Sequence, residues 1–148
     1  MKIADELLIL TKEHHLALSL ANHCKNTFKR NNIDEISALC TTISTKFAQE
    51  FKPHFDTEEQ TLLKFLSTCS NELKQLCAQL ISEHQQLYQL AKDLVNEPQL
   101  LPEFASLLAA HARLEDRQVF PNISLLSETQ KQQVLEASRQ HPQAQKLW

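Results

Sequence analysis

The sequence of 148 residues contains no glycine. Tight β-hairpins, Rossmann turns and P-loops need glycine, because they require positive φ angles or a close approach of the backbone. The absence therefore argues against these folds and against the nucleotide sites built on them. Residues of high helix propensity dominate instead, and hydrophobic residues, which make up 42% of the chain, recur at helical spacing. The composition predicts an all-α fold.

Long apolar runs and basic stripes are also missing. The chain has no uninterrupted apolar stretch of about 18 residues, and no apolar segment with a small-residue cleavage site follows its N-terminus. We therefore expect a cytoplasmic protein that does not bind membranes. The formal net charge is −3, from 15 basic and 18 acidic residues, and no basic stripe is interleaved with aromatic residues. Nucleic-acid binding is not expected.

The four cysteines show no spacing typical of a zinc ribbon or a secreted disulfide framework. No two of them form a C-x-x-C pair. We expect them to be small buried hydrophobic side chains in a reducing compartment. They are Cys24, Cys40, Cys69 and Cys77.

The length predicts a single domain over residues 1–148. Hydrophobic periodicity predicts long helices over about residues 3–29, 34–66, 71–96 and 102–119, which form an antiparallel up-down four-helix bundle over about 3–121. Pro53 predicts a kink, a local bulge or a plain break in the second helix. An S-x-x-Q capping box at 127–130 predicts a short extra helix to about residue 140. In the tail beyond it, we expect His141 to be solvent-exposed and Trp148 to be structural or loosely ordered.

A histidine followed four residues later by a glutamate, and then by a second acid, occurs twice. The pairs are His54 with Glu58 and His111 with Glu115. On a helix, residues i and i+4 lie on the same face, and apolar residues continue that face on both sides of each pair. The polar groups should therefore point into a core, where an unpaired carboxylate costs several kcal/mol unless a cation binds it. Each pair predicts half of a two-metal site.

The other two long helices each offer an inward histidine. These are His14 or His15 on the first helix and His84 on the third. Imidazole and carboxylate ligands without thiolate suit iron, manganese or zinc, and six protein ligands exceed what tetrahedral zinc can use. Two iron ions bridged by Glu58 and Glu115 fit these ligands best.

Four segments, in the correct order and at helix-length separations, resemble the hemerythrin-like, or HHE cation-binding, family. They are E-H-H-x-A-L at Glu13–Leu18, H-F-x-x-E-E at His54–Glu59, E-H-x-x-L at Glu83–Leu87, and H-x-x-x-E-D followed by V-F-P at His111–Pro121. The resemblance covers about residues 8–121 and implies an oxo- or hydroxo-bridged non-haem di-iron centre. The ligands that it implies are His15 or His14, His54, Glu58, His84, His111 and Glu115. His15 is preferred, because a leucine follows it after three residues as one follows His84, although the helical stripe also accommodates His14.

The sequence departs from the family at Tyr88. Oxygen-carrying hemerythrins have a second histidine on the third helix, one turn after the first, and Tyr88 stands at that position. This departure argues against reversible oxygen carriage. Tyr88 is a candidate to bind the cofactor or its ligand, as a phenolate or through a hydrogen bond, and a core aromatic is the alternative. Glu59 and Asp116 are expected to be partners of the ligands or solvated acids, and His23 a surface residue.

The leading hypothesis is a di-iron protein that binds, senses or reacts with a small ligand such as dioxygen, nitric oxide or peroxide, in oxygen binding or in a stress response. The alternatives are an enzyme that decomposes hydrogen peroxide or nitric oxide, and a protein that stores or delivers iron. Both binding and turnover of such a ligand are compatible with these residues, and the oligomeric state is left open.

Overall fold

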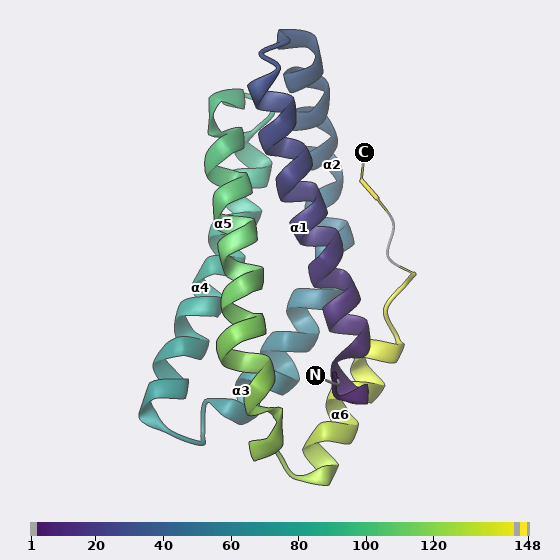
Figure 1. Cartoon of the computed structure of the whole chain (residues 1–148), viewed down its shortest axis with the longest axis vertical. Coiled ribbons are helices and arrows are strands. Elements are labelled where there is room, and N and C mark those ends of the chain that lie inside the picture. Colours follow the sequence, from purple (N-terminus) through teal and green to yellow (C-terminus); the bar gives the residue numbers. More distant parts are fainter. Residues whose placement is uncertain (1–2, 144–145, 148) are drawn as a thin grey trace.

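Four long helices form an antiparallel bundle in the computed structural model, which describes residues 3–143, 146 and 147 (Figure 1). Consecutive helices run in opposite directions, and α1 packs against α2 and α5 while α4 packs against the same two helices. The described residues contain no strand. The predicted all-α bundle with an extra C-terminal helix is confirmed. The long helices are α1 (Leu8–Lys29), α2 (Ile33–Thr57), α4 (Asn71–Asp93) and α5 (Leu101–Leu114).

The turns between the helices are formed without glycine. Side chains cap the starts of helices, and one asparagine adopts a left-handed conformation. Asn32 accepts a hydrogen bond from the backbone N–H of Glu35 (3.0 Å), and Ser70 does the same for α4. Among the described residues, only Asn31, between α1 and α2, has a positive φ, at 55°. Asparagine enters this region more readily than other residues with a side chain, and here it takes the place usual for glycine.

Two of the helices widen into π-helical turns where the sequence predicted regular helix. The first, Glu58–Leu62, follows α2 and leads into α3 (Leu63–Leu66), and the second, Glu115–Val119, follows α5. The predicted helices over 34–66 and 102–119 are corrected accordingly, since an irregularity was expected only at Pro53 in the first of them. Pro53 lies within α2, which continues through it without a break, so the irregular turn comes one turn after the residue expected to cause it. Such π turns are common at functional sites, and each begins at the glutamate of a His-x-x-x-Glu pair.

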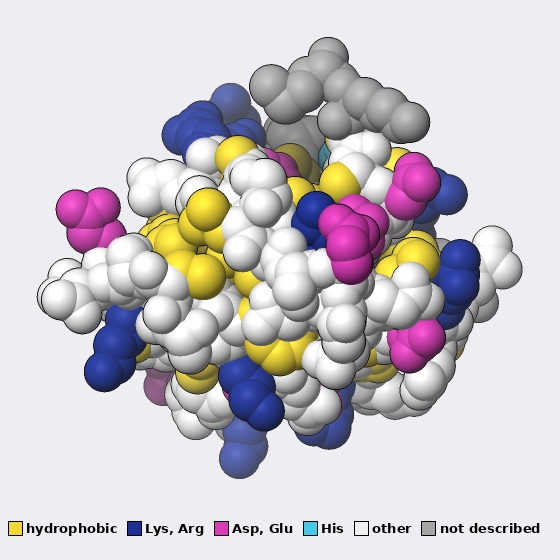
Figure 2. All heavy atoms as spheres, turned by 90° about the horizontal axis from the view of Figure 1, so that it is seen from below, with side chains coloured by type: hydrophobic (Ala, Val, Ile, Leu, Met, Phe, Trp, Pro, Cys, Tyr) yellow, Lys and Arg dark blue, Asp and Glu magenta, His cyan; other side chains and the backbone are white. Residues whose placement is uncertain are grey.

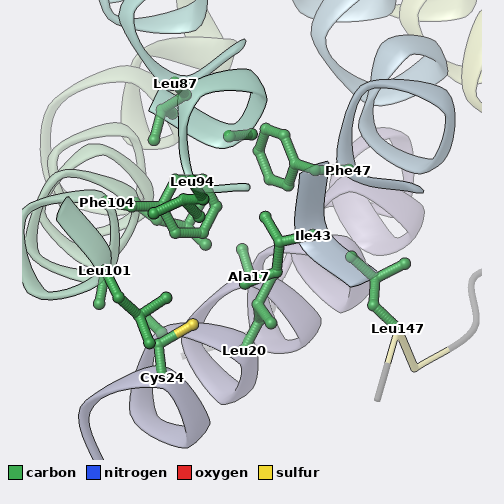
Figure 3. Close-up of a cluster of buried hydrophobic side chains, with 14 of the residues drawn as sticks. Ala17, Leu20, Cys24, Ile43, Phe47, Leu87, Leu94, Leu101, Phe104 and Leu147 are labelled. Carbon is green, nitrogen blue, oxygen red and sulfur yellow. The ribbon is translucent and has the colours of Figure 1, made fainter. Parts of the chain in front are cut away.

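Two apolar clusters lie at different levels of the bundle. One includes Phe47 and Phe104 (Figure 3), and the other includes Leu62 and Val119. Along every long helix, the residues of the two clusters are separated by the polar residues predicted to bind metal. The apolar clusters therefore fix the four helices on both sides of a buried polar layer.

The ends of the bundle differ most from the predicted boundaries. A 3-10 turn (Asp5–Leu7) precedes α1, α4 ends at Asp93, and another 3-10 segment (Phe120–Leu125) follows the second π turn. Phe28, in the last turn of α1, is 36% exposed, and Val95, beyond the end of α4, is 50% exposed.

Helix α6 (Glu128–Arg139) packs across one end of the bundle beside the start of α1. The predicted capping box is confirmed, since Ser127 and Gln130 exchange side-chain and backbone hydrogen bonds. Figure 2 shows this end of the molecule, where basic and acidic side chains are interspersed around hydrophobic ones. Within the described part of the chain, no helix is long and apolar enough to cross a membrane.

Candidate metal centre

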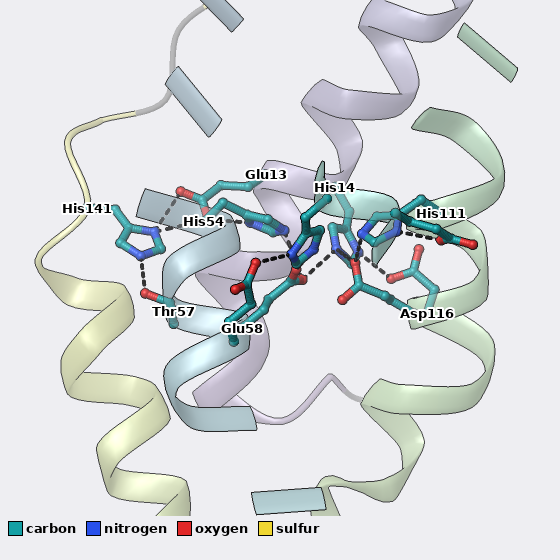
Figure 4. Close-up of polar contacts among 12 residues, drawn as sticks. Glu13, His14, His54, Thr57, Glu58, His111, Asp116 and His141 are labelled. Atoms are coloured by element: carbon teal, nitrogen blue, oxygen red, sulfur yellow. Dashed lines mark hydrogen bonds and ion pairs between the residues drawn. The ribbon is translucent and has the colours of Figure 1, made fainter. Parts of the chain in front are cut away.

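The polar layer brings together side chains from all four long helices or the π turns that follow them. Each of these residues is 3% exposed or less (Figure 4). They are His14, His54, Glu58, His84, His111 and Glu115. The structure therefore brings together residues that the spacing argument selected, and packing against the apolar clusters holds them at one point.

The ligand atoms form two overlapping groups. In each group, one nitrogen or oxygen per residue lies within 4.8 Å of the others. The first group is His14, His54, Glu58 and Glu115, and the second is Glu58, His84, His111 and Glu115. Because both glutamates belong to both groups, the arrangement suits two metal ions with two shared carboxylates.

The four Nε2 atoms face these two glutamates. The Oε2 atom of Glu58 lies 2.9 Å from Nε2 of His54, and its Oε1 atom lies 3.1 Å from Nε2 of His84. One Glu58 oxygen therefore faces each group. The Oε1 atom of Glu115 lies 2.9 Å from Nε2 of His111 and 3.3 Å from that of His14.

Every one of the four histidines also has a carboxylate at its Nδ1 atom. The pairs are His14 with Asp116 (2.8 Å), His54 with Glu13 (2.9 Å), His84 with Glu59 (2.7 Å) and His111 with Glu83 (2.8 Å). An ionised carboxylate only accepts hydrogen bonds, so we assign the proton to Nδ1, which leaves the Nε2 lone pair free for a metal. The carboxylates thus fix both the tautomer and the direction of each imidazole.

These four carboxylates occupy two kinds of position in the sequence, and each kind occurs twice. Glu13 and Glu83 directly precede a ligand histidine, and Glu59 and Asp116 directly follow a shared glutamate. Each acid contacts a histidine on a neighbouring helix, so that α1, α2, α4 and α5 are linked in a closed ring of such contacts. The expected role of Glu59 and Asp116 as partners of ligands agrees with these contacts. Sequence reasoning assigned no role to Glu13 or Glu83, and the repeated Glu-His pair was the signal available for them.

Unpartnered buried atoms show that the donor set suits a cation. The Nε2 atom of His111 and both carboxylate oxygens of Glu115 are buried without a hydrogen-bond partner in the described structure. His111 Nε2 and Glu115 Oε1 lie 2.9 Å apart, but not in hydrogen-bonding geometry. An unsatisfied buried polar group costs about 1–3 kcal/mol, and metal coordination removes that cost.

Without a metal, the layer attracts protons. Burial lowers the pKa of His54, but the charge of Glu58 and the hydrogen bond to Glu13 outweigh it and raise that pKa to about 9. Burial likewise lowers the pKa of His111, but the charge of Glu115 outweighs this effect and raises that pKa to about 10. Burial raises the pKa of the Glu58 carboxyl, but His54, together with hydrogen bonds from His14 and His84, holds that pKa well below its usual value. The centre therefore favours positive charge, as a proton or as a metal ion.

The structure places His14 in the layer and His15 outside it. His14 is 2% exposed and belongs to the first group, whereas His15 is exposed to solvent. The preference for His15 is corrected, because His14 follows buried Leu10 by four residues and precedes buried Ala17 by three, so it shares their face of α1.

Tyr88 packs in the wall of the bundle, half-buried, outside both ligand groups. Its ring meets those of Phe55 and Phe47 edge to face, with centroids 5.4 and 6.3 Å apart. Burial and the nearby acids Asp56 and Glu59 raise the pKa of its hydroxyl, which disfavours a phenolate. His23 also lies outside both groups.

The predicted exposure of His141 is wrong. Its side chain is 5% exposed and contacts Glu13 and Thr57. Sequence reasoning missed this contact because it joins residues 128 positions apart, and no local pattern marks it.

The model of the family described as hemerythrin HHE cation binding domain matches residues 5–123. The matched range contains both ligand groups and ends before α6. Comparison with curated proteins and with solved structures gives no match.

Proposed function

The chain belongs to the hemerythrin HHE cation-binding domain family, and from this premise we propose that it is a non-haem di-iron protein that binds, senses or reacts with a small oxygen-derived ligand. The ligand class comprises dioxygen, nitric oxide and peroxide. The observation that carries the proposal is the pair of overlapping ligand groups, in which buried atoms of His111 and Glu115 have no hydrogen-bond partner among the described residues.

Each ion would have two histidines of its own. His14 and His54 would hold one ion, His84 and His111 the other, and the two shared glutamates would bind both. Four ligand residues per ion are fewer than six-coordinate iron accepts, which leaves room for an external ligand. An iron pair supplies redox chemistry and Lewis acidity that these side chains lack. The protein's part is to hold the imidazoles through their Nδ1 partners and to keep the layer dry.

One observation favours turnover as the second candidate function. Two of the Nδ1 partners reach solvent, since the side chains of Glu59 and Asp116 are 27% and 38% exposed. Decomposition of hydrogen peroxide or nitric oxide requires proton transfer, and these acids connect the ligands His84 and His14 to water.

Reversible oxygen carriage is not part of the proposal. Tyr88 occupies the place of the second histidine that oxygen-carrying hemerythrins have on this helix, and its ring packs on Phe55. We assign Tyr88 to the wall of the site. All four cysteines are free thiols, which fits our expectation of a cytoplasmic protein; Cys24, Cys40 and Cys77 are buried as expected, whereas Cys69 is exposed.

Anaerobic loading with ferrous iron tests the proposal. We expect two ions per chain, one for each ligand group, and a change in the absorption spectrum on addition of peroxide or nitric oxide. Glu58→Ala should lose both ions, because Glu58 belongs to both groups, whereas His23→Ala should keep both. A spectral change without loss of peroxide would indicate binding, and rapid loss of peroxide would indicate an enzyme. If the wild-type protein takes up no iron, the proposed function is wrong.

A further inference from the structure

The segment that follows α6 lies outside the matched family domain and reaches back to the metal centre. We infer that its His141 is a positioning residue for one metal position, that of His14 and His54, on which it acts through Glu13. The inference rests on the proposed two-metal function. It concerns residues of this chain beyond position 123, where the match to the family ends.

His141 is held between α1 and α2. Its Nδ1 atom lies 2.9 Å from Oε2 and 3.1 Å from Oε1 of Glu13, and its Nε2 atom lies 2.6 Å from the Thr57 hydroxyl (Figure 4). The Glu13 carboxylate only accepts, so Nδ1 of His141 donates to it, while Nε2 lies within hydrogen-bonding distance of the Thr57 hydroxyl. The ring thus joins a carboxylate on α1 to a hydroxyl on α2.

The same carboxylate orients a proposed metal ligand. The Oε1 atom of Glu13 lies 2.9 Å from Nδ1 of His54 and therefore accepts from both imidazoles. A carboxylate with one firm partner can rotate about its side-chain torsions, whereas a second donor from another element restricts it. Because outer partners of a ligating histidine fix its ring orientation and basicity, restricting Glu13 also restricts His54.

The segment that carries His141 is anchored on both sides. Before it, α6 buries Val134 and Ser138, and after it, Leu147 packs into the apolar cluster of Figure 3 with 7% of its surface exposed. His141 and Leu147, together with Glu13 and His54, line a cavity of about 160 Å³. Packing therefore anchors the segment on both sides of His141, and hydrogen bonds hold the imidazole against Glu13 beside this cavity.

Among the residues that the structure describes, none from outside the four long helices supports the other metal position in this way. The equivalent carboxylate there, Glu83 beside His111, accepts a hydrogen bond from Gln79, which lies one turn earlier on the same helix and is exposed. The two halves of the centre are alike in their ligands but differ in what holds the outer carboxylate. Loss of His141 should therefore weaken one metal position and spare the other.

Single-position variants make this difference measurable. His111→Ala leaves the position of His14 and His54, and His54→Ala leaves that of His84 and His111. We would titrate each protein anaerobically with ferrous iron in competition with a chromogenic chelator, with and without His141→Leu. In the His111→Ala protein, His141→Leu should lower the iron affinity of the remaining position about tenfold. This is the lower end of the loss that follows when a hydrogen-bond partner of a metal-binding histidine is removed. In the His54→Ala protein, it should leave the affinity unchanged.

Two further variants serve as controls. His141→Asn places an amide N–H near the position of Nδ1, so it should restore most of the affinity in the His111→Ala protein. Gln79→Ala removes the hydrogen bond of 2.9 Å that Gln79 donates to Glu83, the outer carboxylate of the other metal position. This change should not alter the iron affinity of the His111→Ala protein. Circular dichroism checks that each metal-free protein is helical.

The outcomes separate this inference from the proposed function. No iron in the wild-type protein would overturn the function. Normal loading of the wild type, with His141→Leu weakening both single-position proteins equally or neither of them, would overturn the role of His141. If a single-position variant does not fold, two-step titration of the two-position protein decides, because His141→Leu should weaken one equivalent of iron only.

Discussion

At the scale of single residues, the phase of one helix decides which histidine reaches the centre. His14 and His15 are neighbours, but successive residues on a helix point about 100° apart, so only one can face the core. Burial of Leu10 and Ala17 fixes the rotation of α1 and turns His14 inward.

The adjacent histidines give a matched pair of variants. We expect His14→Ala to lose the metal ion of its group, because one of the four ligand residues is removed, and to retain the other ion. His15→Ala should bind both ions, since His15 is exposed. Metal analysis after gel filtration gives the stoichiometry. Equal metal content in the two variants would contradict the assignment of His14.

At the scale of elements, helix ends and π turns position the layer. Both shared glutamates stand at the first residue of a π turn, where the wider helix shifts the following residues relative to a regular α-helix. A capping box starts α6 and so determines where the chain turns back towards Glu13. Local backbone geometry therefore supports both the shared ligands and His141.

The capping box predicts a measurable loss of stability. Ser127→Ala removes the side-chain acceptor for the backbone N–H of Gln130, 3.1 Å away, and should lower the free energy of unfolding by about 1 kcal/mol. Urea unfolding followed by circular dichroism measures this. Ser106→Ala, an exposed position within α5, is the control and should change that free energy by less than about 0.5 kcal/mol. Similar losses in both variants would show that the cap contributes nothing specific.

At the scale of the whole molecule, metal binding and folding are coupled through protons. In the metal-free protein, the raised pKa values of His54 and His111 stabilise the fold fully below about pH 6.5, and this contribution is lost as the pH rises through about 9 to 10. The lowered pKa of Glu58 contributes stability above about pH 4.5 that is lost as the pH falls through its folded value. A metal needs neutral imidazoles, so its binding strengthens as the pH rises.

The melting temperature should therefore depend on pH in opposite ways with and without metal. We expect the metal-free protein to lose stability between about pH 6.5 and 10, and the stabilisation by ferrous iron to grow over the same range. At a free iron concentration 100 times the Kd, each ion adds about 2.7 kcal/mol to the free energy of unfolding. Anaerobic thermal melts of loaded and chelator-treated protein test this. Glu58→Ala, which lacks a shared ligand, should show no shift with iron, and a pH-independent effect of iron on the wild type would contradict the linkage.

Local patterns in the sequence were sufficient to predict the helices and most of the candidate ligands that the structure brings together. The spacing of His54 and Glu58, and of His111 and Glu115, placed each pair on one helix face, and the Ser127 cap marked the start of the last helix. These features depend on residues within one or two turns of each other, where helix geometry fixes the relative positions. The resemblance of the four motifs to the family predicted that they meet at one metal centre, and the match of the family model over residues 5–123 agrees with this resemblance.

The tertiary structure alone decided the rotation of α1, the π turns and the partners of the ligands. Whether His14 or His15 faces inward depends on packing between helices, and the π turns at Glu58 and Glu115 have no local marker comparable to a proline or a cap. Glu13 receives hydrogen bonds from residues 41 and 128 positions away, so no periodicity could reveal it as the link between His54 and His141. Contacts between distant segments form only when the whole bundle closes, and for that reason they are decided by the fold.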